Sequence, residues 1–259
     1  MKSFETGKVT GRAFGITLYA EPGWGKTTLA AHASDVRIIM CGQETGYLTL
    51  LSRDLVPDVP RAHVKSWAEF KSVCREIYDA KEPGKVLAID SLSELERLCH
   101  DFVMSRDFND NAKAFDSYGR GYKVAMQEIA KAVQMFSKLK EKGVSVLLIG
   151  HSTVKTVQNP ITGDVDQVLM DVHKNTMGMI NEWSDAFLFG QFESDMQKDD
   201  ETGRQIVRST KRVLHCAQSP SHVAKNRLGL PDRIEMPDDP ANMWSAFRSA
   251  IINAKREVK

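Results

Sequence analysis

The stretch that most constrains the fold of this 259-residue chain is FGITLYAEPGWGKTTLA, from Phe14 to Ala30. An apolar run of strand-forming residues comes first, and residues that open a helix come last. Between them, residues 20–27 follow the P-loop pattern of four free positions before Gly-Lys-Ser/Thr, except that Ala20 replaces the usual first glycine. A small residue still permits the turn, so the stretch predicts a phosphate-binding loop. The alternative, a glycine-rich turn with a chance lysine, is disfavoured by the flanking strand and helix.

The chemistry of phosphate binding explains each residue type in this loop. Gly23 and Gly25 let the backbone curl so that consecutive N–H groups face phosphate oxygens, and the following helix adds its positive N-terminal end. Lys26 can reach the β- and γ-phosphates, while the Thr27 hydroxyl can ligate Mg²⁺. The predicted nucleotide-binding residues are Gly23, Trp24, Gly25, Lys26, Thr27 and Thr28. We therefore expect a nucleoside triphosphate, ATP, with Mg²⁺.

The amino-acid composition indicates the environment of the protein more than its function. Hydrophobic content of 42% and charged content of 27% supply a core for a water-soluble α/β protein. Because the net charge is +1, any nucleic-acid surface has to be local. The four cysteines form no CxxC, which indicates a reduced compartment and disfavours zinc. We find no signal-peptide pattern and no bilayer-length apolar run, so we expect a cytoplasmic protein without a membrane partner.

Strand and helix patterns alternate along the chain, which predicts a mostly parallel sheet with ligands at the carboxyl ends of its strands. The predicted strands cover residues 14–19, 36–40, 63–65, 85–90, 144–150, 186–192 and 206–216. Predicted helices follow the P-loop and the capping box at 66–69, and cover about 92–107, 123–142 and 241–257. Residues 151–183 show little regular pattern. The last two strands read as a hairpin, so the C-terminal side should be antiparallel. We treat residues 1–259 as one domain.

Three polar residues at the ends of predicted core strands are candidates for chemistry. Asp90 is in the Walker B position, where a carboxylate holds the Mg²⁺ shell beside Thr27; the alternative is a helix cap. Glu44, flanked by glycines after the second strand, can polarise a water as general base, unless it is a solvated loop residue. Glu94 is its rival but falls inside a helix. His151 can sense the γ-phosphate, although a lone histidine is often structural.

Residues Ala20–Thr28, Glu44, Asp90 and Gly150–His151 together resemble the RecA-like ATPase core, in which the base follows the second strand. Lys225-Asn226-Arg227, followed by Gly229, resembles the lysine-x-arginine finger of hexameric helicases and RecA-like proteins. The chain is similar to the short phage-encoded RecA-like ATPases that act as single-strand annealing proteins. This resemblance extends from the P-loop to about Met236.

The resemblance implies an ATPase that acts on single-stranded DNA in phage-type recombination or annealing, with hydrolysis stimulated by DNA. It also implies a homo-oligomer, a ring or a filament, with the nucleotide at the subunit interface. There Lys225 and Arg227 would reach the γ-phosphate bound by the neighbouring subunit. A single-strand-binding protein is a further implied partner. The implied catalytic set is Lys26, Glu44, Asp90, His151, Lys225 and Arg227.

The stretch that matches the first DNA-facing loop, residues 105–123, interleaves cations with aromatic residues. Its predicted DNA-binding residues are Arg106, Lys113, Arg120 and Lys123, and its aromatic residues are Phe108, Phe115, Tyr118 and Tyr122. Single strands need charge for their phosphates and flat faces for their bases. The alternative is a solvated loop whose aromatics tuck onto the core. The second such stretch, residues 152–174, carries few cations.

Two other functions stay open. A P-loop kinase or other small-molecule phosphotransferase would need an arginine-bearing lid, for which Arg204, Arg208 and Arg212 are candidates. A nucleotide-gated interaction module would bind nucleotide with little turnover. A GTPase is disfavoured because the chain has no Asn-Lys-x-Asp motif.

Overall fold

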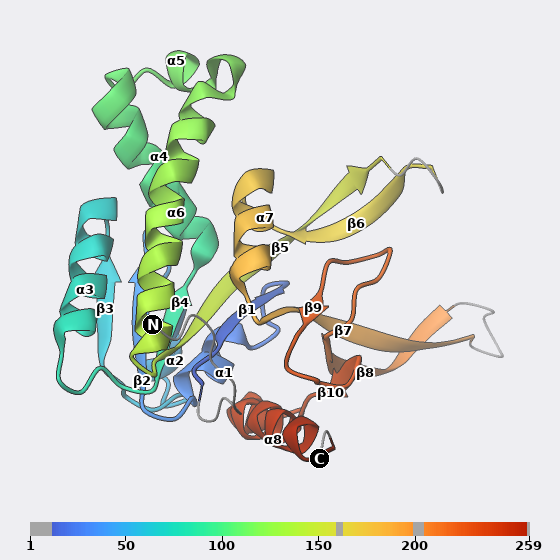
Figure 1. The fold of residues 1–259 in the computed structure, drawn as a ribbon. Helices are drawn as coiled ribbons and strands as arrows, with labels where there is room; N and C mark the ends of the chain where they lie inside the picture. Colours follow the sequence, from blue (N-terminus) through green and yellow to red (C-terminus); the bar gives the residue numbers. More distant parts are fainter. Residues whose placement is uncertain (1–11, 159–162, 199–204, 258–259) are drawn as a thin grey trace, which may run out of the picture.

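One mixed sheet organises the fold (Figure 1). The computed structural model describes residues 12–158, 163–198 and 205–257. In these residues, ten strands follow the order β10-β8-β7-β1-β5-β4-β2-β3, with β6 paired to β5 and β9 paired to β7. The strands are β1 (Gly15–Ala20), β2 (Val36–Cys41), β3 (Arg61–Val64), β4 (Val86–Asp90), β5 (Ser145–Val157), β6 (Val165–Met170), β7 (Ala186–Lys198), β8 (Gln205–His215), β9 (Lys225–Asn226) and β10 (Arg233–Glu235).

The strand that leads into the P-loop, β1, lies at the centre of the sheet and pairs in parallel with both β5 and β7. Strands β4, β2 and β3 continue the parallel part beyond β5. On the C-terminal side, β8, β9 and β10 pair antiparallel. These pairings confirm the predicted fold class, an α/β RecA-like P-loop core with antiparallel strands toward the C-terminal side. All six residues of β1 are buried, as expected for a strand covered on both faces.

Helices cover both faces of this sheet. They are α1 (Lys26–Ala31), α2 (Gly46–Leu51), α3 (Trp67–Asp79), α4 (Leu92–Phe108), α5 (Ala112–Asp116), α6 (Arg120–Glu141), α7 (Lys174–Trp183) and α8 (Met243–Glu257). Side chains of α3, α4, α6 and α7 share one buried cluster with Tyr19, and side chains of α1, α2 and α8 share the other with Leu18. Adjacent residues of β1 therefore face opposite layers. Among the described residues, no helix is both long and apolar enough to cross a membrane.

The capping box predicted at the start of α3 is present. The Ser66 hydroxyl accepts the backbone N–H of Glu69 at 3.2 Å. The Glu69 carboxylate in turn accepts the N–H of Lys65 at 2.8 Å. These bonds satisfy donors that a helix start leaves unpaired, so α3 begins where the sequence places it.

The expectation of little pattern over residues 151–183 is wrong. Strand β5 runs on to Val157 and returns as β6 in an antiparallel hairpin, and α7 follows. Residues 159–162 of the predicted turn lie outside the described residues. The hairpin extends away from the core in Figure 1, and Val154 is 65% exposed. Because residues 154–158 and 163–164 are exposed, the outer part of this ribbon lacks the apolar contrast by which strands are predicted from sequence.

A substitution of Phe136 on α6 tests this arrangement of helices against the sheet. It is 1% exposed and packs against the rings of Phe70 and Trp183. Phe136→Ala should lower the free energy of unfolding by about 3–5 kcal/mol, because it leaves a cavity in the helical layer. Urea denaturation followed by circular dichroism measures the change. Gln134→Ala, at an exposed position of the same helix, should shift it by less than about 0.5 kcal/mol. Equal effects of the two variants would contradict the burial of Phe136.

Candidate active site

The P-loop leaves the carboxyl end of β1 and enters α1. Gly23 has φ of 82° and Gly25 has φ of 103°, in the left-handed region that favours glycine. A Cβ on Gly23 would meet no atom within 4 Å, so this part of the loop borders open space. Helix α1 has only six residues, which makes its dipole small. The helix therefore adds little positive potential for a phosphate, which leaves the loop N–H groups and the Lys26 ammonium to supply it.

The Lys26 side chain is held over the loop. It is 7% exposed, and its Nζ donates to the carbonyl oxygens of Ala20 at 2.7 Å and Glu21 at 2.9 Å. Burial lowers the pKa of Lys26 to about 8, although nearby carboxylates oppose the shift. An anion beside this buried ammonium would favour its charged form. Lys26 therefore fits the phosphate-binding role predicted for it.

Thr27 and Asp90 meet beside the loop. The Thr27 hydroxyl donates to Asp90 Oδ2 at 2.7 Å, and Asp90, the last residue of β4, is 4% exposed. Burial raises the pKa of Asp90 to about 6, while the hydrogen bond from Thr27 acts in the opposite direction. A hydroxyl and a carboxylate are the oxygen ligands that Mg²⁺ takes from proteins. This donor set fits the cation, whose charge would favour ionised Asp90.

Glu44 follows β2, and His151 lies within β5 where its pairing with β1 ends, so the two meet at the same edge of the sheet. Glu44 Oε1 lies 2.6 Å from His151 Nε2 and accepts the Ser91 hydroxyl at 2.9 Å. The hydrogen bond from His151 lowers the pKa of Glu44, with burial opposing it. Glu44 is therefore ionised at neutral pH, as a general base must be. His151 also pairs in register with Ala20, so it connects the start of the P-loop to Glu44.

Ser91 is a site residue that the sequence analysis does not assign. Besides donating to Glu44, its hydroxyl caps α4 by accepting the N–H of Glu94 at 3.3 Å. The available signal is the Ser-x-x-Glu capping pattern directly after Asp90. Glu94 itself accepts the N–H of Gln43 at 3.3 Å and pairs with an arginine one turn along α4. These contacts hold the loop after β2, so Glu44 stays the candidate base.

Lys225 and Arg227 lie at the opposite edge of the sheet. Strand β9 pairs with the start of β7, where Asn226 faces Ala186. Ala186 in turn pairs with Ile16, near the start of β1. The P-loop follows the far end of β1, which is about 15–20 Å away at about 3.3 Å per residue. Neither cation is therefore placed to reach the phosphate site of its own chain.

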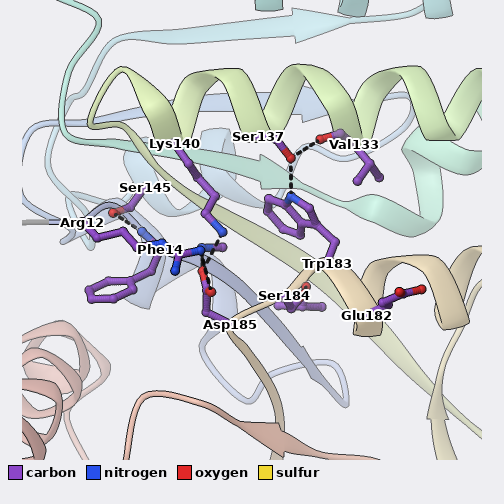
Figure 2. A network of polar contacts seen from close by, with 12 residues as sticks. Arg12, Phe14, Val133, Ser137, Lys140, Ser145, Glu182, Trp183, Ser184 and Asp185 are labelled. Atoms are coloured by element: carbon purple, nitrogen blue, oxygen red, sulfur yellow. Dashed lines mark hydrogen bonds and ion pairs between the residues drawn. The ribbon is translucent and has the colours of Figure 1, made fainter. Parts of the chain in front are cut away.

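Asp185 connects several segments at the amino edge of the sheet, where the parallel strands β1 and β7 begin (Figure 2). Its carboxylate accepts the N–H of Gly15 at 2.8 Å and Lys140 Nζ at 2.6 Å. Although burial opposes ionisation, the hydrogen bond from Lys140 helps to lower the pKa of Asp185. Trp183, two residues earlier, donates its indole N–H to Ser137 at 3.0 Å. The Asp185 carboxylate thus joins the start of β1 to the end of α6, and the Trp183–Ser137 hydrogen bond joins the end of α7 to the same helix.

The side chains of Lys225 and Arg227 differ in their contacts. Lys225 Nζ donates to the carbonyl oxygens of Asn181 and Glu182 at the end of α7, the latter at 3.0 Å. The Arg227 backbone N–H donates to the carbonyl of Asp185 at 2.9 Å, while its side chain is exposed. Lys225 therefore holds α7 in this structure, and Arg227 is the more accessible cation.

The stretch predicted to bind DNA is helical rather than a loop. Residues 105–123 cover the end of α4, all of α5, a 3-10 turn and the start of α6, at the tip of a helical pair that extends beyond the sheet in Figure 1. Arg106 is engaged with Asp107 and with Glu128 at 2.9 Å. The other predicted DNA-binding residues, Lys113, Arg120 and Lys123, are exposed.

Three of the four aromatic residues in this stretch pack inward. The Phe115 ring contacts Phe108 and Tyr122 with centroid distances of 5.5 and 5.0 Å. Tyr122 also stacks on His173 at 4.7 Å. Tyr118 is the exception, because it is 96% exposed and has φ of 51°. The tip therefore presents one aromatic side chain to solvent beside its cations.

The arginine lid that a kinase would need is not formed by Arg212. Its guanidinium donates to the backbone carbonyls of Trp24, Pro237 and Asp238. Arg204 lies outside the described residues, as does the side chain of Arg208. Trp24, predicted among the nucleotide-binding residues, is 0% exposed and its ring packs against β7. Its side chain therefore faces the protein rather than the open side of the loop.

The sheet order, the P-loop and the Thr27–Asp90 pair define a P-loop protein of the ATPase class. A family model described as the AAA domain matches residues 12–228. The chain belongs to this AAA domain family. No curated protein sequence matches it. Among solved structures, the flagellar accessory protein FlaH from Methanocaldococcus jannaschii is similar, with a TM-score of 0.45 and 10% identity over 87% of this chain and 85% of that one.

Glu44→Gln tests the candidate base. Nucleotide binding should persist, and turnover should fall by about 10²-fold or more, because the amide cannot take a proton from water. Phosphate release and equilibrium nucleotide binding, measured on the same preparations, separate the two steps. Glu94→Gln, one helix turn beyond Ser91, is the matched control and should retain most of its turnover. The reverse pattern would assign the base to Glu94.

Proposed function

We propose that this chain binds ATP with Mg²⁺ and hydrolyses it while acting on single-stranded DNA as a homo-oligomer. Hydrolysis is inferred from the ionised Glu44, which hydrogen-bonds His151 and Ser91. Glu44 lies at the same edge of the sheet as the Thr27–Asp90 pair. We place the chain with the short RecA-like ATPases of phage-type recombination or annealing, as one domain over residues 1–259, with a single-strand-binding protein as a further partner.

Each site residue has its own role in the proposed binding and hydrolysis of ATP. Lys26 and the N–H groups of the loop bind the phosphates and neutralise their charge. Thr27 and Asp90 would hold Mg²⁺, which would supply charge stabilisation on the phosphate oxygens when bound. Glu44 orients a water and accepts its proton. His151, bonded to Glu44 and level with Ala20, keeps the carboxylate in place and links it to the loop.

The tip of the α4–α6 pair supports single-stranded DNA as the partner. Tyr118 offers a solvent-facing ring, and Arg120 and Lys123 follow it on the same tip. Its ring gains little from burial and its backbone has positive φ, which is unfavourable for a non-glycine residue, so folding stability does not explain this tyrosine. Base stacking on such a ring, with phosphates on the neighbouring cations, is how sequence-tolerant proteins bind single strands.

The opposite placement of Arg227 and the P-loop supports hydrolysis at a subunit interface. Arg227 is exposed and lies at the amino edge of the sheet, where it is remote from its own Lys26. An arginine supplied by a neighbouring subunit stabilises the charge that develops during phosphoryl transfer, by about 10³ to 10⁵ in turnover where fingers have been measured. Lys225, beside it, belongs to the same proposed contact.

Replacing the tip residues tests the DNA proposal. Tyr118→Ala should weaken binding of a single-stranded oligonucleotide about tenfold at fixed salt, with little change in stability. The double variant Arg120→Ala/Lys123→Ala should also reduce the slope of log affinity against log salt by about 0.7 per lost phosphate contact. Lys138→Ala, exposed near the other end of α6, is the control. Wild-type protein that ignores single strands, or variants that bind normally, would favour a kinase or a nucleotide-gated module.

Mixing two inactive variants tests the shared site. Lys26→Ala lacks a working phosphate site but keeps Arg227, whereas Arg227→Ala has the reverse defect. Their mixture should regain part of the hydrolysis, and wild-type specific activity should rise steeply with protein concentration. A mixture of Lys26→Ala with Glu44→Gln is the control, because both defects lie in the same site. Hydrolysis that is independent of concentration, with no rescue in the first mixture, would rule out the interface.

A further inference from the structure

The tryptophan in the P-loop is anchored outside the loop. Trp24 occupies one of the free positions of the motif, yet it is fully buried. Its ring lies so close to Gly190 of β7 that a Cβ there would come within 2.5 Å of it. Its indole N–H donates to the carbonyl of Gln191 at 3.2 Å. The loop is therefore attached to β7 by a large side chain that no phosphate contact requires.

Arg212 of β8 holds the same point from its backbone side. Its Nε donates to the carbonyl of Trp24 at 2.7 Å. One terminal nitrogen donates to the carbonyls of Pro237 at 2.9 Å and Asp238 at 2.8 Å. The guanidinium also lies over the Phe192 ring, 5.2 Å from its centroid. A planar group with several fixed donors can bridge two segments in this way, whereas a lysine ammonium cannot keep the same geometry.

Two further contacts join the loop to the same surroundings. Glu21 Oε1 accepts the N–H of Phe192 at 3.4 Å. On Gly25, a Cβ would lie 3.2 Å from the sulfur of Met243 and 3.4 Å from Pro240. The loop is thus bordered by the β7–β8 hairpin on one side and by the segment leading into α8 on the other.

We infer that Arg212 and Trp24 form a clamp that keeps the P-loop in its phosphate-binding shape, with Arg212 as a positioning residue for nucleotide binding. The inference rests on the nucleotide binding proposed above. These contacts come from β7, β8 and the segment at the start of α8, and none of them involves Lys26 or Thr27, so their role is to fix the loop backbone. Because linkage is reciprocal, nucleotide binding should in turn order residues 190–192 and 236–243.

The experiment compares Arg212→Ala and Arg212→Lys with Arg233→Ala. Arg233 belongs to the neighbouring strand β10 and bonds Glu193, without touching the loop. The affinity for Mg²⁺ and a non-hydrolysable ATP analogue should fall about tenfold in Arg212→Ala, since hydrogen bonds from a charged group are lost. Arg212→Lys should show a smaller loss, and Arg233→Ala none. In turnover, the Arg212 variants should raise KM more than they lower kcat.

Folded Arg212→Ala with wild-type affinity would overturn the clamp. If this variant does not fold, hydrogen exchange of the wild-type protein decides, because the analogue should slow exchange at residues 190–192 and 236–243. Binding without that protection would also overturn the inference. A wild-type protein that binds no nucleotide would instead overturn the proposed function, and the clamp with it.

Discussion

Parallel pairing of β1 with β5 and β7 is the constraint on which the site depends. Because β2 and β4 run in the same direction, the residues that follow or end these strands meet at one edge of the sheet. Asp90 ends β4, Glu44 follows β2, and His151 lies level with the end of β1. The apolar residues before them supply the burial that fixes the strands, so the hydrophobic core and the polar site come from the same segments. A register slip of one residue in β5 would turn His151 to the other face and separate it from Glu44.

Burial gives this edge its electrostatic character. Lys26 and Asp90 are both shielded from water, which moves the pKa of the lysine down to about 8 and that of the carboxyl up to about 6. Loop carbonyls and the Thr27 hydroxyl are their partners in this structure. A bound phosphate and a divalent cation would replace these weak partners with full opposite charges, in a region where water screens little. The fold thus holds two charges ready at a cost in stability that ligand binding would offset.

Much of the architecture follows from the sequence, because the buried parallel strands have strong apolar contrast and the P-loop fixes the direction of the first one. The meeting of Asp90, Glu44 and His151 follows too, because the carboxyl ends of parallel strands share an edge. His151 reaches that edge although β5 continues beyond it to Val157. Side-chain contacts between segments that are distant in the sequence could not be predicted in this way. They depend on how the side chains pack in three dimensions, and no local sequence pattern indicates that packing. The Ser91 hydrogen bond and the Trp24–Arg212 contact are of this kind. So is the tip of α4–α6, where α5 folds its aromatics inward and only Tyr118 stays outside.

The two edges of the sheet also restrict how copies of this chain could share a site. The P-loop lies at the carboxyl edge and Arg227 at the amino edge, so a contact that brings them together joins two different surfaces. A two-fold dimer could bring them together only through one patch that contains both, so that Arg227 of each subunit meets the loop of the other. Head-to-tail contact brings Arg227 of one subunit to the loop of the next without that requirement. Repetition of that contact gives a ring if the rotation closes and a helical filament if it does not. Because Arg227 and the loop lie at opposite ends of the parallel strands, the proposed shared site fits a head-to-tail ring or filament more simply than a two-fold dimer.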